Sequence, residues 1–235
     1  MTPRHFRVLS LICVALSLAA AAILGSLSRR DAFLARGIPA ALPEPITHGG
    51  ARPGVNVYLE RLGEGELRST LEEIRSSDLE YVKQSFYFRE AFDWESADRI
   101  VEAIAEEGLT LVPLLDGNPD EQFAPPRNTG AYAAWAGEFA RRYADRITYY
   151  MIWDEPNLAS HWGGMPANAG DYAALLSAAA SAIRQNDPDA VIVTAPLAPT
   201  VETGPENFSE PVFLRRLYQA GAAPAFDVVA SKPYG

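Results

Sequence analysis

The segment Ile152-Trp153-Asp154-Glu155-Pro156-Asn157 holds the residues of this chain that are best suited to catalysis. Glu155 stands close to an indole and a proline, and partial burial among such groups raises the pKa of a carboxyl group. A raised pKa suits a general acid that donates a proton near neutral pH. The alternative is a structural carboxylate that caps a helix or forms a salt bridge. We expect Glu155 to be a general acid, with Asp154 in the same site.

Six short apolar runs alternate with amphipathic helical patterns from residue 54 onward, and the segment with Glu155 ends the fourth run. The runs begin near residues 55, 81, 110, 147, 191 and 227. Strands that alternate with helices of about 10–15 residues indicate right-handed crossovers and a parallel sheet. No glycine-rich fingerprint follows the first run, which argues against a dinucleotide-binding fold.

Capping residues mark several of the expected helices. Asp93 is expected to cap the helix that ends at Gly108, and Thr129 to cap the next one. Ser209 is expected to cap the helix that precedes the sixth run, which spans residues 226–230.

The alternation predicts a (β/α)8 TIM barrel, in which catalytic groups stand where strands end. A complete barrel needs about 250 residues, whereas 182 residues lie from Gly54 to Gly235. We therefore expect about six of the eight βα units, in an N-terminal fragment of a larger protein. Six strands alone would leave two open edges. A self-sufficient six-stranded open sheet is the alternative.

The fourth-strand segment resembles a motif of the large clan of retaining (β/α)8 glycoside hydrolases, where an Asn-Glu-Pro run carries the acid/base glutamate. Phe92-Asp93-Trp94 with Asp98, after the strand that contains Lys83, is similar to the second unit of that clan. The resemblance covers about residues 54–235. It implies hydrolysis of O-glycosidic bonds of a carbohydrate by retaining double displacement.

The resemblance also implies roles for single residues. Glu155 matches the acid/base, and Asp154 stands where the clan has an asparagine that hydrogen-bonds the sugar 2-hydroxyl. A carboxylate accepts that bond but cannot donate as an amide does. Lys83 takes the place of a basic residue near the end of the second strand, and Tyr234 resembles a tyrosine or histidine that lines the site. The clan's nucleophile is a glutamate that ends a seventh strand, and this chain contains no such strand.

Further residues near Glu155 are candidates for contact with the substrate. Trp162 is a candidate wall of a sugar subsite, with loop packing as the alternative, and His161 is a candidate ligand contact. Trp153 and Asn157 are assigned to substrate binding with them. Asp116 ends the third run and is a candidate second carboxylate, although we expect it to cap a loop. The three histidines are scattered, so no metal site and no cofactor are expected.

Two other functions fit the same barrel. Lys232 ends the sixth run, where a lysine with a depressed pKa forms a Schiff base in some aldolases. That hypothesis leaves the Trp-Asp-Glu-Pro segment unexplained. The second is a non-catalytic, membrane-tethered barrel that binds carbohydrate and lacks a nucleophile.

The N-terminal residues form a segment of their own. From Val8 to Ser28 there are 21 residues without a charge, and arginines flank both ends. About 20 apolar residues suffice to cross a bilayer as a helix. We expect residues 1–30 to be a membrane anchor with the catalytic domain outside the cytoplasm, or a cleaved signal peptide of a secreted protein. Residues 31–53 are rich in proline and glycine and read as a linker to a domain at 54–235.

The charge and cysteine content exclude several classes of partner. The first 30 residues hold four arginines and no acidic residue, so the remainder carries 16 basic and 30 acidic residues. A protein domain with this excess of negative charge repels the phosphate backbone of nucleic acids, which excludes a nucleic-acid partner. Cys13 is the only cysteine, which excludes an intramolecular disulfide and a cysteine zinc site. The expected partners are a carbohydrate and a membrane.

Overall fold

The computed structural model describes residues 3–34 and 52–232, and the chain divides into two compact units, 1–46 and 47–235. The first unit contains the helix α1 (Pro3–Leu34). Within α1, Ile12–Arg29 form a stretch with a mean hydropathy of 1.8, none of which is buried in protein. A helix of this length and composition fits either a signal anchor or a signal peptide.

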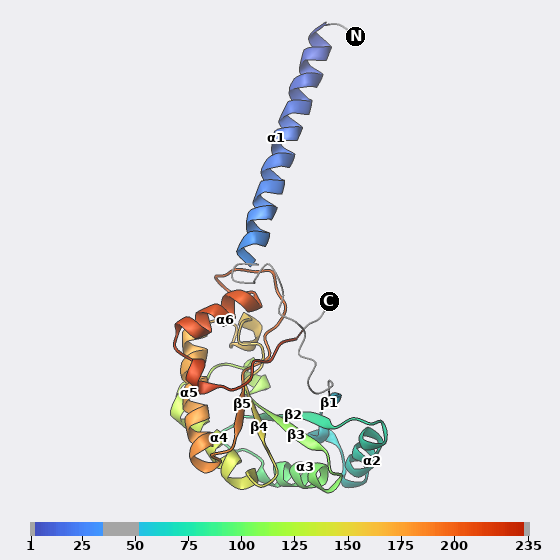
Figure 1. Cartoon of the computed structure of the whole chain (residues 1–235), viewed down its shortest axis with the longest axis vertical. Helices are drawn as coiled ribbons and strands as arrows, with labels where there is room; N and C mark the ends of the chain where they lie inside the picture. The colour runs from blue at the N-terminus through green and yellow to red at the C-terminus, as the bar shows by residue number, and fades with distance from the viewer. Residues whose placement is uncertain (1–2, 35–51, 233–235) are drawn as a thin grey trace. The chain divides into compact units, whose positions relative to one another are not determined.

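The second unit is built on a parallel sheet in the order β1-β2-β3-β4-β5 (Figure 1). The strands are β1 (Gly54–Val57), β2 (Tyr81–Tyr87), β3 (Thr110–Asp116), β4 (Tyr149–Ile152) and β5 (Val191–Val193). Each strand pairs with the next strand along the chain. This chain-order pairing is what successive right-handed βα units produce.

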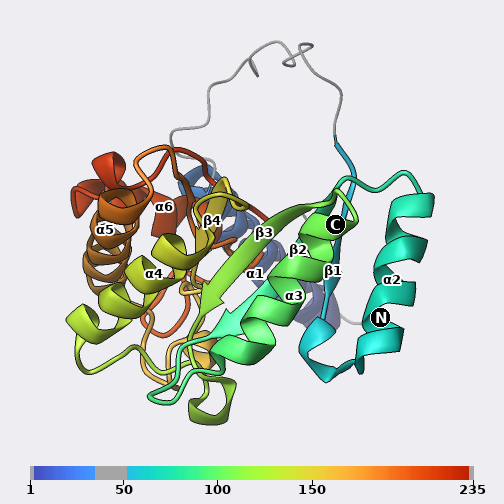
Figure 2. The same cartoon turned by 90° about the horizontal axis from the view of Figure 1, so that it is seen from below.

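One α-helix follows each strand. These helices are α2 (Glu64–Ser76), α3 (Trp94–Glu106), α4 (Thr129–Tyr143), α5 (Ala169–Asn186) and α6 (Glu210–Gln219). Short 3₁₀ helices complete the chain: η1 (Leu59–Arg61), η2 (Pro119–Glu121), η3 (Ala159–His161) and η4 (Ala223–Ala225). Helices α2 to α5 succeed one another along one side of the sheet (Figure 2). The unit therefore has an α/β TIM-barrel-like fold, as the sequence predicts.

Side chains of the strands alternate between the helices and the inner face of the sheet. In β2, Val82 and Phe86 are buried, whereas Lys83 and Tyr87 are only half-buried. Phe86 packs against Phe139 of α4, with ring centroids 4.9 Å apart. Because successive side chains of a strand point to opposite faces, Lys83 and Tyr87 lie on the inner face.

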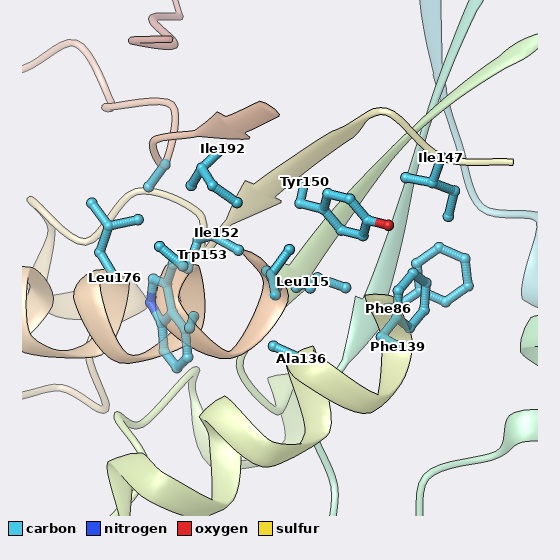
Figure 3. Packing of buried hydrophobic residues seen from close by; sticks show 14 of the residues in the cluster. Phe86, Leu115, Ala136, Phe139, Ile147, Tyr150, Ile152, Trp153, Leu176 and Ile192 are labelled. Carbon is cyan, nitrogen blue, oxygen red and sulfur yellow. The ribbon is translucent and has the colours of Figure 1, made fainter. Parts of the chain in front are cut away.

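The core fills the space between the sheet and its helices (Figure 3). Leu115, Ile152 and Ile192 come from three neighbouring strands and meet side chains of α4 and α5, including Phe139 and Leu176. Full burial of a side chain of this size contributes about 1.5–3 kcal/mol. This packing holds the carboxyl ends of β3, β4 and β5 in fixed positions.

Two buried tyrosines form hydrogen bonds with the backbone at the carboxyl ends of β3 and β4. The Tyr132 hydroxyl donates to the Leu115 carbonyl oxygen at 2.5 Å. The Tyr172 hydroxyl donates to the Ile152 carbonyl oxygen at 2.9 Å and accepts from the Ala195 N–H at 2.7 Å. Tyr172 therefore connects the end of β4 with the segment after β5.

The predicted sixth strand is present only as two parallel bridges, Val193 with Val228 and Leu197 with Ser231. Side chains take over part of the expected ladder. The Ile192 N–H donates to the Asp227 carboxylate at 2.8 Å, and the Ala230 N–H donates to the Thr194 hydroxyl at 3.0 Å.

Two of the three predicted N-cap positions are right, and one of these two makes the capping hydrogen bond. Asp93 caps α3 and accepts from the Ser96 N–H at 3.0 Å. The cap of α4 is Asn128, whose side-chain oxygen accepts from the Gly130 N–H, and Thr129 is the first helical residue instead. Ser209 stands at the N-cap of α6 without a side-chain capping bond.

We predict that Tyr172→Phe lowers the free energy of unfolding by roughly 1–3 kcal/mol, because the Ile152 carbonyl and the Ala195 N–H lose their buried partner. Chemical denaturation measures the change. Tyr218→Phe is the control, since Tyr218 is exposed and its hydroxyl makes no hydrogen bond to the described residues. Equal stability of the two variants would contradict the role of the Tyr172 hydroxyl.

Candidate active site

The chain makes a sharp kink directly after β4. Trp153 has φ of 71° and Glu155 has φ of 44°. Non-glycine residues rarely adopt this left-handed region, and such residues gather at functional sites. The Glu155 N–H donates to the Pro196 carbonyl oxygen at 3.2 Å, so the kink also contacts the segment after β5.

Packing around Trp153 maintains the kink. Its side chain is fully buried, and its indole N–H donates to the His161 carbonyl oxygen at 3.1 Å. The ring lies against Gly117, where an added Cβ would come within 2.6 Å of the indole. With Trp153 turned inward, the two following side chains, Asp154 and Glu155, face Lys232.

An ammonium group lies between these two carboxylates. Lys232 Nζ is 2.7 Å from Glu155 Oε1 and 2.9 Å from Asp154 Oδ1, and all three side chains are about 15% exposed. His161 Nδ1 lies 3.3 Å from the other Glu155 oxygen, Oε2. Both oxygens of Glu155 therefore face a nitrogen, which differs from the apolar surroundings that the sequence predicts.

The ion pairs decide the protonation of Lys232. Burial lowers the pKa of Lys232, but hydrogen bonds to Glu155 and Asp154 outweigh burial and raise this pKa overall. A Schiff-base lysine needs the opposite shift, because only the neutral amine attacks a carbonyl group. The hypothesis that Lys232 forms a Schiff base is therefore not supported.

A cavity of about 240 Å³ adjoins this cluster on the inner face of the sheet. Its lining includes polar residues from separate segments, among them Lys83 of β2, Asp116 of β3, Asp154, His161 and Lys232. Phe123 also lines the cavity, and its ring stacks on His161 with centroids 4.8 Å apart. The fold thus brings together candidates that are distant in the sequence.

A larger groove of about 1250 Å³ lies between the loops that follow β2 and β3, where Phe92 and Pro125 are among its walls. None of the predicted site residues that the structure describes lines this groove. We therefore place the candidate site at the smaller cavity.

Asp116 is buried at the end of β3 and carries an unusual pKa. Burial raises the pKa of Asp116 to about 8, and the nearby Asp154 carboxylate adds to the shift. The backbone N–H groups of Gly117 and Asp154 oppose it, the first at 2.8 Å from Oδ1. At neutral pH this carboxyl group is mostly protonated and can donate a hydrogen bond.

Three residues that the sequence assigns to substrate binding lie inside the protein. Trp153, Asn157 and Trp162 are at most 1% exposed and do not line the cavity. The Asn157 amide donates to the carbonyl oxygens of Ala198 and Phe208, both at 2.9 Å. Trp162 packs on Trp153, with ring centroids 5.5 Å apart. These side chains stabilise the loop that carries His161. Trp162 therefore packs within this loop, which is the alternative to a wall of a sugar subsite. Tyr234 lies outside the described residues.

Asp154, Glu155 and His161 also form a group of possible metal ligands, with one atom of each within 4.8 Å of the others. The spacing of the histidines did not predict this group, because it contains one histidine and two acidic residues. The Lys232 ammonium already supplies positive charge to both carboxylates. The pairing of Lys232 with these carboxylates was also not predicted from the sequence, although both Asp154 and the lysine that ends the sixth run were identified.

Comparisons with known proteins support the fold. No protein-family model matches the sequence, and a search of curated proteins finds no match. Among solved structures, a glucosidase from Croceicoccus marinus is similar with a TM-score of 0.57 and 14% identity over 68% of this chain. An endo-1,4-beta-mannanase from Rhizomucor miehei has a TM-score of 0.55 and 11% identity over 69% of this chain. A beta-galactosidase from the psychrophilic Marinomonas ef1 has a TM-score of 0.55 and 10% identity over 78% of this chain. The match spans 38%, 63% and 41% of those chains, respectively. These proteins share the fold, and all three are glycoside hydrolases.

We predict that Lys232→Met lowers the free energy of unfolding by roughly 2–4 kcal/mol near neutral pH, because two partly buried carboxylates lose their shared counter-ion. The loss is expected to shrink in acid, where the carboxylates take up protons. Lys232→Arg, which keeps the charge, should lose less. Urea denaturation checks all three expectations, and a fully stable Lys232→Met variant would contradict the ionic bridge.

The pKa of Asp116 predicts a pH dependence of stability. Because the folded protein binds this proton more tightly than the unfolded chain, the aspartate contributes stability at low pH and loses it as pH rises from about 4 to about 8. Asp116→Asn does not titrate and keeps an oxygen for the Gly117 N–H. Its stability relative to the parent should therefore increase by up to about 1.4 kcal/mol per pH unit in that window.

Denaturation of both proteins at several pH values measures this difference. Asp227→Asn is the control, because the pKa of Asp227 is lowered, with hydrogen bonds from Ile192 and Arg184 outweighing burial. Its effect on stability should stay constant above about pH 6. A difference for Asp116→Asn that does not change with pH would show that the Asp116 pKa is ordinary.

Proposed function

We propose that this protein is a glycoside hydrolase that cleaves O-glycosidic bonds of a carbohydrate, with Glu155 as the general acid/base. One observation carries the proposal: Glu155 stands in a strained kink at the carboxyl end of β4, where TIM-barrel enzymes place catalytic groups. The polar cavity beside it supports a site for a hydroxyl-rich ligand. The fold shared with a glucosidase, a mannanase and a galactosidase supports the reaction class.

The proposed mechanism is a retaining double displacement. Glu155 first donates a proton to the leaving-group oxygen while a second carboxylate attacks the anomeric carbon and forms a glycosyl-enzyme intermediate. The Glu155 carboxylate then takes a proton from water, which displaces the second carboxylate. The two carboxyl groups must stand about 5–5.5 Å apart. The resemblance to the retaining clan assigns the nucleophile to a seventh strand, which the described residues do not contain.

Lys232 and Asp154 are proposed to act together. Asp154 supplies an acceptor for a sugar hydroxyl, and the Lys232 ammonium supplies the donor that a carboxylate lacks. Lys232 also stabilises the negative charge that Glu155 acquires when it has given up its proton. His161 and Lys83 complete the proposed contacts with substrate at the cavity wall.

The proposed placement of the protein follows from its N-terminal helix. Residues 1–30 anchor the chain in a membrane, residues 31–53 form a linker, and the domain at 54–235 lies outside the cytoplasm. Cleavage of the helix as a signal peptide would give a secreted form. The apolar stretch Ile12–Arg29 supports both forms.

A carbohydrate-binding barrel without turnover is the second candidate. The contacts of Lys232 and His161 favour it, since they occupy both oxygens of the proposed acid. This candidate requires that Glu155→Gln bind glycans as the parent does, and that the full-length protein show no hydrolysis.

We predict that Glu155→Ala slows hydrolysis of glycosides with poor leaving groups by about 10²–10⁴-fold in the full-length protein. Activated aryl glycosides need little help from a proton donor and should be slowed much less. Initial rates on an oligosaccharide and on its nitrophenyl counterpart measure the two effects. Glu66→Ala on the exposed side of α2 is the control. Equal losses on both substrates would remove Glu155 from the acid role.

A further inference from the structure

The chain contains only two lysines against 18 arginines, and both lysines line the same cavity. The other 18 residues of the lysine and arginine total are arginines. Lysine differs from arginine in presenting a compact point charge whose pKa responds readily to burial. Their shared location therefore marks the cavity as the one place in this chain where lysine chemistry is used.

The two lysines differ in their partners. Lys232 is held by Asp154 and Glu155. Lys83 forms neither a hydrogen bond nor an ion pair with any residue in the described ranges 3–34 and 52–232, although it is half-buried. The alternation of β2 fixes its place on the inner face, directly opposite Val112 of β3. The strand thus holds its ammonium group at the cavity, where none of the described residues serves as its counter-ion.

Other charges around the cavity do not supply that counter-ion. Asp154 and Glu155 already share the Lys232 ammonium, and Asp116 Oδ1 accepts from the Gly117 N–H at 2.8 Å. Burial lowers the pKa of Lys83; the Asp154 carboxylate opposes this shift and the Lys232 ammonium adds to it. The balance of these effects shows that the nearby carboxylates do not compensate for the burial of the Lys83 charge.

An ammonium group in this position reduces stability. A charge withdrawn from water without a partner is unfavourable, and a methionine or leucine would fill the same space on the inner face, where Val112 and Met151 already lie. Residues that break a local rule in this way are expected at functional sites. A bound anion would remove the unfavourable energy by pairing with Lys83.

We propose that Lys83 binds the carboxylate of an acidic sugar, so that the sugar next to Glu155 is a uronic acid. This inference rests on the proposed function and specifies its substrate class. A neutral sugar would displace water from the Lys83 ammonium and replace its hydrogen bonds only with hydrogen bonds to hydroxyl groups. A uronate returns a charge-assisted hydrogen bond, the stronger kind.

The test compares binding of D-glucuronate and D-glucose by titration calorimetry and saturation-transfer NMR at neutral pH, in the parent and in its variants at Lys83. Sodium acetate at equal ionic strength controls for a carboxylate without a sugar ring. We expect glucuronate to bind about 10-fold or more tightly than glucose, and acetate to bind no better than glucose. The variants are Lys83→Met, which removes the charge, and Lys83→Arg, which keeps it.

Supporting results are a preference for glucuronate in the parent and in Lys83→Arg, and its loss in Lys83→Met. The Lys83→Met variant should be at least as stable to urea as the parent, in contrast to Lys232→Met. If Lys83→Met does not fold, labelling replaces it: glucuronate, and not glucose, should protect Lys83 in the parent from reductive methylation mapped by mass spectrometry.

The opposing results separate this inference from the proposed function. Equal binding of glucose and glucuronate would overturn the acidic substrate and leave the glycosidase proposal standing. A glucuronate preference that persists in Lys83→Met would show that another group binds the carboxylate. Binding of neither sugar would overturn the inference and remove carbohydrate recognition from this cavity as well.

Discussion

The ionic contact of Lys232 with Asp154 and Glu155 is the interaction on which the candidate site depends. Two adjacent carboxylates that face the same way repel each other, and the kink that orients them has left-handed backbone angles at Trp153 and Glu155. The ammonium group compensates for both costs, because it satisfies the two acids that the kink brings together. It also joins two segments that are 77 residues apart in the chain. The end of β4 and the segment after α6 are therefore fixed by the same contact.

The cavity illustrates two ways in which a protein accommodates a buried charge. Asp154 and Glu155 pair with the ammonium group of Lys232. Asp116 lies deeper, at 2% exposure, and retains its proton instead. Lys83 follows neither course in the described residues. The difference between these groups arises from their distance to an opposite charge and from their access to water, since the residue types alone would predict that all are ionised at neutral pH.

The fold class could be predicted from the sequence because it depends on local patterns. Alternation in β2 and the Asp93 cap of α3 are both contained within a few residues. Where two local signals competed, the prediction failed: Asn128 and Thr129 are both good caps, and packing of α4 selects the first. The sixth strand was predicted from its apolar residues. Backbone hydrogen bonds join it to β5 at Ile192 and Thr194, and the Asp227 and Thr194 side chains accept two further ones, which an apolar run does not reveal.

The site could be predicted only in part. The motif around Glu155 located it, since a strand end is a property of the local sequence. Burial of Trp162 depends on Trp153 and Tyr172, which approach it only in the folded chain. The partner of Asp154 and Glu155 was equally hidden, because Lys232 reaches them through the geometry of the sheet. Long-range contacts of this kind are fixed by topology, which a linear pattern does not contain.

The side-chain bonds that join the sixth run to the end of β5 have a consequence for how this protein can change in evolution. Asp227 and Thr194 hold the segment that delivers Lys232 to the two acids, so the acid at 154 is tolerable only in a chain that keeps this whole arrangement. Loss of the lysine alone would remove the shared partner of both carboxylates, and loss of the acid at 154 alone would leave the ammonium with one partner fewer. The residues at positions 154 and 232 thus depend on each other. Descendants of this sequence are expected to keep the two residues together or to exchange them together.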